Sequence, residues 1–209
     1  TILINGKQLK ESTTNIGYML QRDYLFEWRT IYNNVILGLE IQHMLTARTR
    51  RKAHQLLEQY GLESFANARP SELSGGMRQR VMIAMAVILH PDLIIADEPT
   101  TALDVTIQTQ IVELLKDINK SEQNAMLFIT HDLNLARRIC HKVVVMKDGV
   151  VVEADETEKI FMHPKEAYTR NLIEAVPSRL KPRVSVKKES NAKVLTVKDL
   201  SVYYCLLYT

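Results

Sequence analysis

Two short apolar segments that flank one amphipathic segment restrict the fold of this chain more than any other feature. Residues 93–96 and residues 125–129 are apolar runs of the length typical of buried strands. Between them, apolar residues recur with the 3.6-residue period of a helix, at positions 107, 111, 114, 115 and 118. Because a helix that links two such strands makes them parallel, this segment predicts an α/β fold with a largely parallel sheet.

The same pattern continues on both sides. A helix is expected near residues 133–138, followed by a hairpin of residues 143–146 and 150–153 around an Asp-Gly turn. At the amino end, we expect strands at residues 1–4 and 15–20, joined by a polar turn that contains an Asn-Gly pair. The intervening sequence has helical spacing and predicts a mostly α-helical insertion.

Composition excludes several classes of protein. The 209 residues carry a formal net charge of +3, are 46% hydrophobic and include two cysteines. This balance is typical of a globular protein rather than a disordered or disulfide-rich one. The longest uninterrupted apolar run, residues 81–89, falls short of the roughly 20 residues that a membrane-spanning helix needs. We therefore expect a folded protein of a reducing compartment that does not itself cross a membrane.

Basic charge is concentrated near the carboxyl end. Residues 179–198 contain seven Lys or Arg side chains, one acid and no aromatic residue for base stacking. This pattern favours a solvated linker over a nucleic-acid-binding surface, so no nucleic-acid partner is expected. We accordingly divide the chain into a domain of residues 1–178, a basic linker of residues 179–193 and a terminal segment of residues 194–209.

Two adjacent acids, Asp97 and Glu98, follow the apolar strand of residues 93–96. Ligands of open α/β folds bind at the carboxyl ends of the strands, where one acid could hold Mg²⁺ and a second could polarise an attacking water. Both acids can serve one site only if the strand ends there, which Pro99 favours. The alternative is that they are ordinary solvated acids.

His131 and Gln21 each follow a predicted strand in the same way. Parallel pairing would bring His131 near the two acids, where its imidazole could hydrogen-bond a phosphate or position the water. The side-chain amide of Gln21 could reach a metal ion or a water. The alternatives are a satisfied core or surface histidine and a solvated turn residue.

Ser74, Gly75 and Gly76 precede a predicted helix that ends before the His-Pro pair at residues 90–91. The chain has only seven glycines, so two adjacent ones are distinctive. Glycines at the start of a helix let the backbone N–H groups approach a phosphate closely. A glycine-rich helix cap without a ligand is the alternative.

In this combination and order, the motifs resemble those of the ATP-binding subunit of ATP-binding-cassette (ABC) transporters, across roughly residues 1–178. Five elements correspond to the family's Q-loop, signature motif, Walker B strand, D-loop and switch histidine: Gln21, residues 73–80 (LSGGMRQR), residues 93–98, residues 101–104 and His131. The resemblance implies a P-loop NTPase-type, RecA-like parallel sheet with an α-helical subdomain at residues 29–90.

The resemblance also implies ATP and Mg²⁺ as cofactors and assigns catalytic roles. Asp97 would hold Mg²⁺ through water, Glu98 would be the general base, and His131 would sense the γ-phosphate. Gln21 would contact the metal and the attacking water. ATP hydrolysis would then drive transport.

Two further elements are implied to act across a subunit interface. The signature residues would bind the γ-phosphate of ATP held by the opposite subunit, and the D-loop acid would lie beside them: Ser74, Gly75, Gly76 and Asp104. The implied partners are a second ABC ATPase domain (as a dimer or a tandem fusion), transmembrane permease subunits and a solute-binding protein. The implied location is the cytoplasmic face of the cell membrane.

Details of subfamily point in two directions. Residues 72–80 and 163–170 are similar to the peptide and nickel importer group, whereas residues 25–29 are similar to the nitrate, sulfonate and taurine group. We therefore expect an importer of peptides, nickel or another small solute. Residues 194–202 resemble the first strand of a further cassette, from which residues 205–209 depart.

The largest departure from the family is a missing phosphate loop. No Gly-x-x-x-x-Gly-Lys-Ser/Thr string occurs in the 209 residues, and residues 1–9 resemble the strand and turn that follow that loop. We therefore expect the domain to be incomplete at its amino end. Two other functions remain open: a non-transport ABC ATPase of DNA repair or translation, and an inert fragment that completes a partner's ATP site in trans.

Without that loop, the isolated 209-residue chain is expected to show little or no ATP hydrolysis. The measurement is phosphate release by the purified chain. Turnover that Glu98→Gln abolishes would contradict this expectation.

Overall fold

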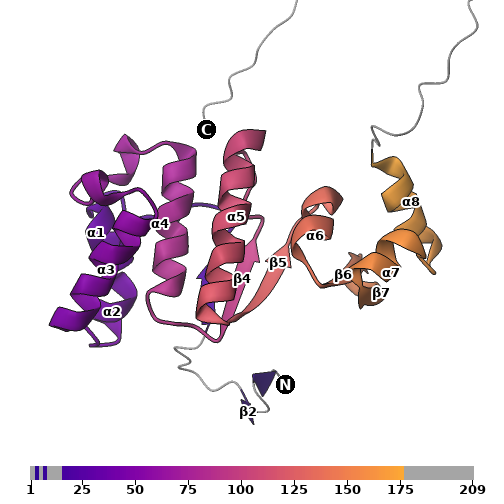
Figure 1. The fold of residues 1–209 in the computed structure, drawn as a ribbon, viewed down its shortest axis with the longest axis horizontal. Coiled ribbons are helices and arrows are strands. Elements are labelled where there is room, and N and C mark those ends of the chain that lie inside the picture. Colours follow the sequence, from indigo (N-terminus) through magenta and orange to yellow (C-terminus); the bar gives the residue numbers. More distant parts are fainter. Residues whose placement is uncertain (1–2, 5–6, 9–15, 177–209) are drawn as a thin grey trace, which may run out of the picture. The chain divides into compact units, whose positions relative to one another are not determined.

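A three-stranded parallel sheet lies at the centre of the described chain (Figure 1). The computed structural model describes residues 3–4, 7–8 and 16–176. The strands of this parallel sheet are β3 (Ile16–Met19), β4 (Leu93–Asp97) and β5 (Ala125–Ile129), in the order β3-β4-β5. Both pairings are parallel, so the prediction of a parallel α/β sheet is confirmed.

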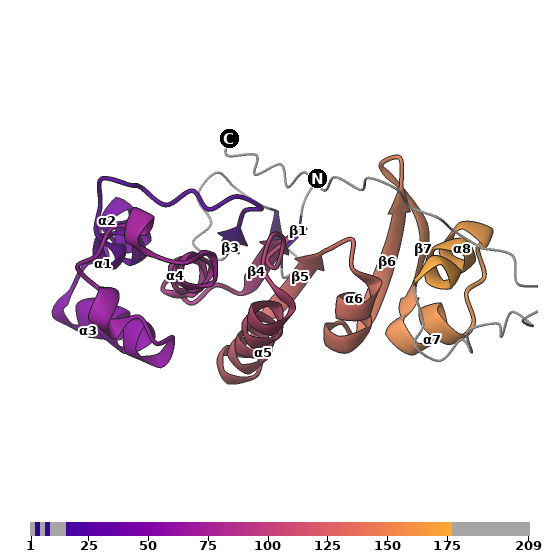
Figure 2. The same cartoon turned by 90° about the horizontal axis from the view of Figure 1, so that it is seen from above.

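Two long helices cover one face of this sheet (Figure 2). They are α4 (Gly75–Val87) and α5 (Val105–Glu122), which share an apolar core with Ile94 and Ala96 of β4. Alternation along a strand sends neighbouring side chains to opposite faces. On the other face, Tyr18, Leu127 and Ile129 are exposed.

The segment between β3 and β4 is helical, as its spacing predicts. It contains α1 (Ile31–Val35), α2 (Leu37–Ile41), α3 (Ala47–Gln59) and two short 3-10 helices at Glu63–Phe65 and Pro70–Glu72. These elements pack through the same apolar core as α4.

Local chemistry sets the limits of α3. Thr46 and Thr49 form a reciprocal capping box at its start, which satisfies two backbone N–H groups there. At its other end, the backbone of Gly61 has φ +70°, a left-handed conformation that glycine adopts readily. The helix buries Leu56 and Leu57 against the core.

After β5 the chain forms α6 (Leu133–Ile139) and an antiparallel hairpin of β6 (Lys142–Lys147) and β7 (Val150–Glu156). Asp148 and Gly149 both have positive φ, as a two-residue hairpin turn with the twist of the strands requires. The predicted hairpin is confirmed.

Two short helices complete this part, α7 (Thr157–Met162) and α8 (Ala167–Ala175). Buried Glu153 of β7 accepts hydrogen bonds from the backbone N–H groups of Lys165 (3.0 Å) and Glu166 (3.2 Å), just before α8. These bonds hold the start of α8 against the hairpin and lower the pKa of Glu153.

The predicted connection at the amino end is wrong. Instead of one turn between strands at residues 1–4 and 15–20, β1 (Leu3–Ile4) pairs in antiparallel fashion with an additional strand, β2 (Lys7–Gln8). Because Leu3 pairs with Gln8 and Ile4 pairs with Lys7, β1 has its partner before β3 begins.

The expected basic linker, residues 179–193, and the expected start of a further cassette, residues 194–209, lie outside the described residues. Within residues 3–4, 7–8 and 16–176, no helix is long and apolar enough to span a bilayer.

The two adjacent glycines of α4 are expected to respond oppositely to alanine. A Cβ at Gly76 would lie 2.6 Å from Cγ2 of Ile107, whereas one at Gly75 would meet its nearest atom, in Leu103, at 3.5 Å. Gly76→Ala should therefore destabilise the fold by about 1–3 kcal/mol through overpacking. Gly75→Ala, the matched control, should be neutral or stabilising by up to about 1 kcal/mol. Thermal or denaturant unfolding measures both, and equal effects would contradict this account.

Candidate functional site

The strand β4 ends between the two predicted acids. Asp97 is its last residue, and Glu98 has φ 48°, a left-handed conformation that is uncommon outside glycine. The Glu98 N–H donates to the carbonyl oxygen of Ile129 in the neighbouring strand at 3.0 Å. The chain therefore leaves the sheet at Glu98, the condition under which both acids can serve one site.

Glu98 and His131, which sequence reasoning placed near each other, are in direct contact. Oε1 of Glu98 lies 2.7 Å from Nδ1 of His131 and accepts a hydrogen bond from the His131 backbone N–H at 3.1 Å. The hydroxyl of Thr101 donates to the other carboxylate oxygen at 2.8 Å. The Glu98 side chain is 16% exposed and that of His131 is 79% exposed, so an oriented carboxylate lies beneath an accessible imidazole.

These contacts shift both pKa values. Burial alone raises the pKa of Glu98, but the hydrogen bonds from His131 and Thr101 outweigh it, and the net pKa lies below its ordinary value. The hydrogen bond with Glu98 and its negative charge raise the pKa of His131. The pair therefore favours a carboxylate and an imidazolium.

Gln21 and Asp97 lie at the same edge of the sheet. Gln21 is exposed and follows β3 by two residues, and Met19 of β3 pairs with Ala96 of β4. Parallel pairing thus places the amide, the two acids and the histidine at the carboxyl ends of three adjacent strands. Neither Gln21 nor Asp97 makes a side-chain hydrogen bond within residues 16–176, in contrast to Glu98 and His131.

The glycine turn and the loop of residues 101–104 lie against each other. Ser74 Oγ accepts from the Met77 N–H at 3.4 Å and caps α4, whereas Asp104 accepts from the Ile107 N–H at 3.0 Å and caps α5. Gly76 is buried against the side chain of Ile107. Close helix packing is thus one physical reason for glycine here, in addition to the predicted approach of a phosphate.

The structure therefore groups the predicted residues into two sets. One set lies at the sheet edge and comprises Gln21, Asp97, Glu98 and His131. The other lies at the starts of α4 and α5 and comprises Ser74, Gly75, Gly76 and Asp104. Among the described residues, no side-chain hydrogen bond or ion pair joins the two sets.

Two contacts had no clear signal in the sequence. Thr101 was predicted only as part of a loop, although a hydroxyl three residues after Glu98 is within reach of its carboxylate. The ion pair between Asp23 and Arg78 (Oδ2 to Nε, 2.7 Å) joins segments that are distant in the chain, so no local pattern indicates it.

Asp97 is the candidate for a metal-binding side chain. Across the described parts of the chain, no group of three or more His, Cys, Asp or Glu side chains is arranged to hold a metal. Mg²⁺ commonly binds through one or two carboxylates together with phosphate oxygens and waters. The Asp97 carboxylate, at the end of β4, fits that kind of site.

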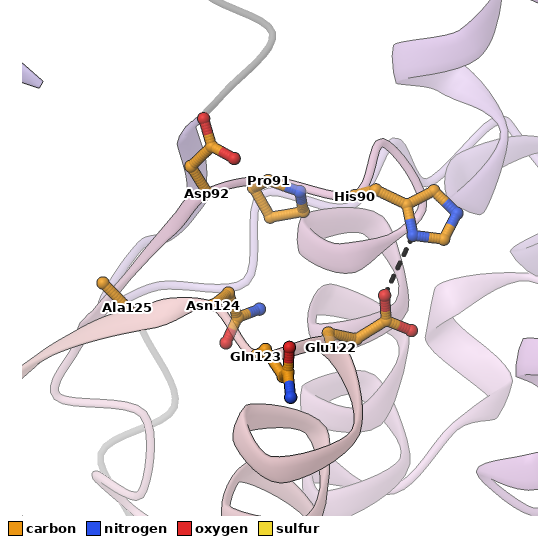
Figure 3. Close-up of a pocket in the computed structure, with 7 residues that line it drawn as sticks. All are labelled: His90, Pro91, Asp92, Glu122, Gln123, Asn124 and Ala125. Atoms are coloured by element: carbon orange, nitrogen blue, oxygen red, sulfur yellow. Dashed lines mark hydrogen bonds and ion pairs between the residues drawn. The ribbon is translucent and has the colours of Figure 1, made fainter. Parts of the chain in front are cut away.

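A polar pocket of about 330 Å³ lies at the opposite edge of the sheet, where β4 and β5 begin (Figure 3). In it, His90 Nδ1 lies 2.9 Å from a carboxylate oxygen of Glu122, which also pairs with Lys52 at 3.5 Å. The hydrogen bond with His90 and the charge of Lys52 outweigh burial and lower the pKa of Glu122. The pocket is separate from the candidate site, because the two occupy opposite ends of the strands.

Known proteins are similar to this chain in sequence. A family model described as "ABC transporter" matches residues 1–101. The peptidoglycan transport ATP-binding protein YejF of Agrobacterium fabrum is 45% identical over 79% of this chain and 31% of its own length. The methionine import ATP-binding protein MetN 2 of Bacillus anthracis is 35% identical over 90% of this chain and 56% of its own length.

A solved structure agrees with these sequence matches. The dimeric post-hydrolysis state of the ATP-binding cassette MJ0796, bound to ADP and Pi, has a TM-score of 0.61 and 37% identity, covering 68% of this chain and 63% of that one. In sequence and in structure, the chain is therefore similar to the ATP-binding subunits of ABC transporters. It spans about a third of the length of the YejF relative and about half that of the MetN relative.

Replacing Glu98 by Gln is expected to lower the pKa of His131 toward its ordinary value of 6.5, because the substitution removes the negative charge that raises it. NMR titration of the His131 ring measures this shift. Glu158→Gln, at an exposed acid of α7, is the control and should leave the titration unchanged. An unchanged titration in Glu98→Gln would show that the contact is absent in solution.

The same pair predicts how the folded state depends on pH. Because the pKa of His131 is raised, its contribution to stability is lost as pH rises through the folded-state value. Because the pKa of Glu98 is lowered, the contribution of Glu98 to stability is lost as pH falls through its folded-state pKa. The pair therefore stabilises the fold most between the ordinary values of 4.5 and 6.5, which comparison of Glu98→Gln with the parent chain across this range tests.

Proposed function

We propose that this chain is part of an ATP-hydrolysing, energy-coupling subunit of an ABC importer. The observation that carries this proposal is the hydrogen-bonded Glu98–His131 pair at the carboxyl edge of a parallel sheet, in a chain that is similar to this family. ATP and Mg²⁺ are the proposed cofactors.

Glu98 acts as the general base. Its lowered pKa keeps the carboxylate ionised, and the bonds from His131 and Thr101 fix its direction. A carboxylate held in this way can accept a proton from a water aligned with the γ-phosphate. The Nε2–H group of the exposed His131 ring is available to donate a hydrogen bond to that phosphate.

Asp97 and Gln21 hold the metal side of the site. Mg²⁺, when bound, neutralises phosphate charge and polarises the reacting phosphoryl group. Asp97 supplies a carboxylate for it, through water, and Gln21 supplies an amide oxygen from the neighbouring strand end. Neither side chain has a competing hydrogen bond within residues 16–176.

Ser74, Gly75, Gly76 and Asp104 serve a second ATPase domain. Among the described residues, no side-chain hydrogen bond or ion pair joins these residues to the Glu98–His131 pair, which supports action on a different nucleotide. The matched MJ0796 structure is a dimer bound to ADP and Pi, which is the arrangement this role needs. Dimerisation or a tandem fusion would supply the partner.

The proposed cargo is a small peptide-like or amino-acid-like solute. The names of the relatives, peptidoglycan transport and methionine import, support that class, and nickel and other small solutes are the wider possibilities. The proposed partners are transmembrane permease subunits at the cytoplasmic face of the membrane and a solute-binding protein.

A second function is favoured by one observation. The 209 residues contain no Gly-x-x-x-x-Gly-Lys-Ser/Thr string with which to hold ATP. A chain that lacks this motif could instead complete the ATP site of an intact partner through Ser74, Gly75 and Gly76.

The decisive experiment uses the native polypeptide that contains these residues. Glu98→Gln is expected to lower the rate of ATP hydrolysis by about 10²–10⁴-fold, because a general base is lost, while ATP binding is kept. Glu158→Gln is the matched control and should hydrolyse ATP normally. A Glu98→Gln protein that retains turnover overturns the catalytic proposal. If turnover is instead lost in Ser74→Ala and kept in Glu98→Gln, the result favours the second function, in which this chain only completes the ATP site of a partner.

A further inference from the structure

We propose that the Asp23–Arg78 ion pair is a positioning link. It fixes the position of the segment that carries Gln21 relative to the first turn of α4. Asp23 follows Gln21 by two residues, and Arg78 follows Gly76 by two residues. The ion pair therefore joins the segment that carries Gln21 to the helix turn that contains Gly76. This inference rests on the proposed function for its catalytic meaning but not for its geometry.

The segment that carries Gln21 has few other anchors. From the end of β3 to Tyr24, the side chains of residues 20–24 are all exposed. The next anchors are buried Leu25 and then Phe26, whose backbone N–H donates to Asn34 Oδ1 at 2.8 Å. These later contacts tie the chain to α1. Among the hydrogen bonds and ion pairs of the described residues, the Asp23–Arg78 pair is the one that joins residues 20–24 to α4.

On the other side, Arg78 belongs to the turn that presents Ser74 and the glycines. Its backbone N–H donates to the Ser74 carbonyl oxygen at 2.9 Å, the first hydrogen bond of α4. A displacement of Arg78 therefore moves the start of the helix. The position of Gln21 is therefore coupled to that of Ser74 through the backbone of residues 21–23, the Asp23–Arg78 ion pair and the backbone of residues 74–78.

The link is electrostatic. Nε of Arg78 lies 2.7 Å from Oδ2 of Asp23, yet this buried nitrogen has no aligned hydrogen-bond acceptor in the described chain. The two side chains are 35% and 40% exposed, so an effect of about two- to fivefold on the population of the linked arrangement is expected. Screening at about 1 M salt, where the Debye length is about 3 Å, should weaken it.

The test measures the distance across the link without nucleotide. Nitroxide labels are placed at Arg22→Cys and Ser71→Cys in the full chain, with Cys140→Ser and Cys205→Ser as background. Pulsed EPR should give a narrow distance distribution for the parent and a broader one for Arg78→Gln and for Asp23→Asn. The exchanged pair, Asp23→Arg with Arg78→Asp, should restore the narrow distribution. High salt should broaden the parent but not Arg78→Gln.

The matched control removes another exposed ion pair. Lys159→Gln breaks the contact of Lys159 with Glu156 (3.2 Å) and should leave the distribution narrow. Unfolding of each variant is followed by circular dichroism, and Asp23→Asn, in an exposed segment, serves if Arg78→Gln fails to fold. A distribution that is unchanged in Asp23→Asn, or is not restored in the exchanged pair, overturns the link.

A second measurement separates this link from the proposed function. In the native polypeptide, Asp23→Asn should lower kcat for ATP hydrolysis by about two- to fivefold with KM little changed, and the exchanged pair should recover it. Normal kcat in Asp23→Asn overturns the positioning role. If no variant hydrolyses ATP while the EPR distances respond as expected, the proposed function fails and the geometric link stands.

Discussion

The parallel pairing of β4 with both β3 and β5 is the constraint on which the candidate site depends. Because all three strands run in one direction, their carboxyl ends meet at one edge and deliver Gln21, Asp97, Glu98 and His131 there. The left-handed backbone at Glu98, held by the Ile129 carbonyl, then turns the second acid out of the strand alternation. An antiparallel neighbour would have placed its carboxyl end at the opposite edge, beside the pocket of His90 and Glu122.

The glycine turn illustrates how one residue can meet two requirements. Gly76 must be small because α4 and α5 approach so closely there that any side chain would meet Ile107. The same bare backbone at a helix start is what a phosphate ligand requires. Packing between α4 and α5 alone accounts for glycine at position 76. A Cβ would fit at Gly75, so packing between these helices does not explain glycine there.

Much of the fold follows from local patterns. The strand of residues 93–97, the stripe on α5 and the turn at Asp148 and Gly149 were predictable, because each depends on neighbours within a few residues. The connection between the strands at residues 1–4 and 15–20 was predicted wrongly, since an Asn-Gly pair does not say which strand follows it. The ion pair of Asp23 and Arg78 had no local signal, because it exists only after β3 and α4 have packed.

By itself, the sequence determined the order of strands and helices, the motifs that resemble an ABC ATPase, and the residue types available for phosphate and Mg²⁺ chemistry. Only the tertiary structure decided that the Glu98 carboxylate bonds to both His131 and Thr101, and that Gly76 packs against Ile107 of α5. The physical reason is the distance along the chain over which each interaction acts. Periodicity and turn chemistry act between neighbours in the chain, whereas these contacts depend on strand order, on where β4 leaves the sheet and on how closely α4 and α5 pack.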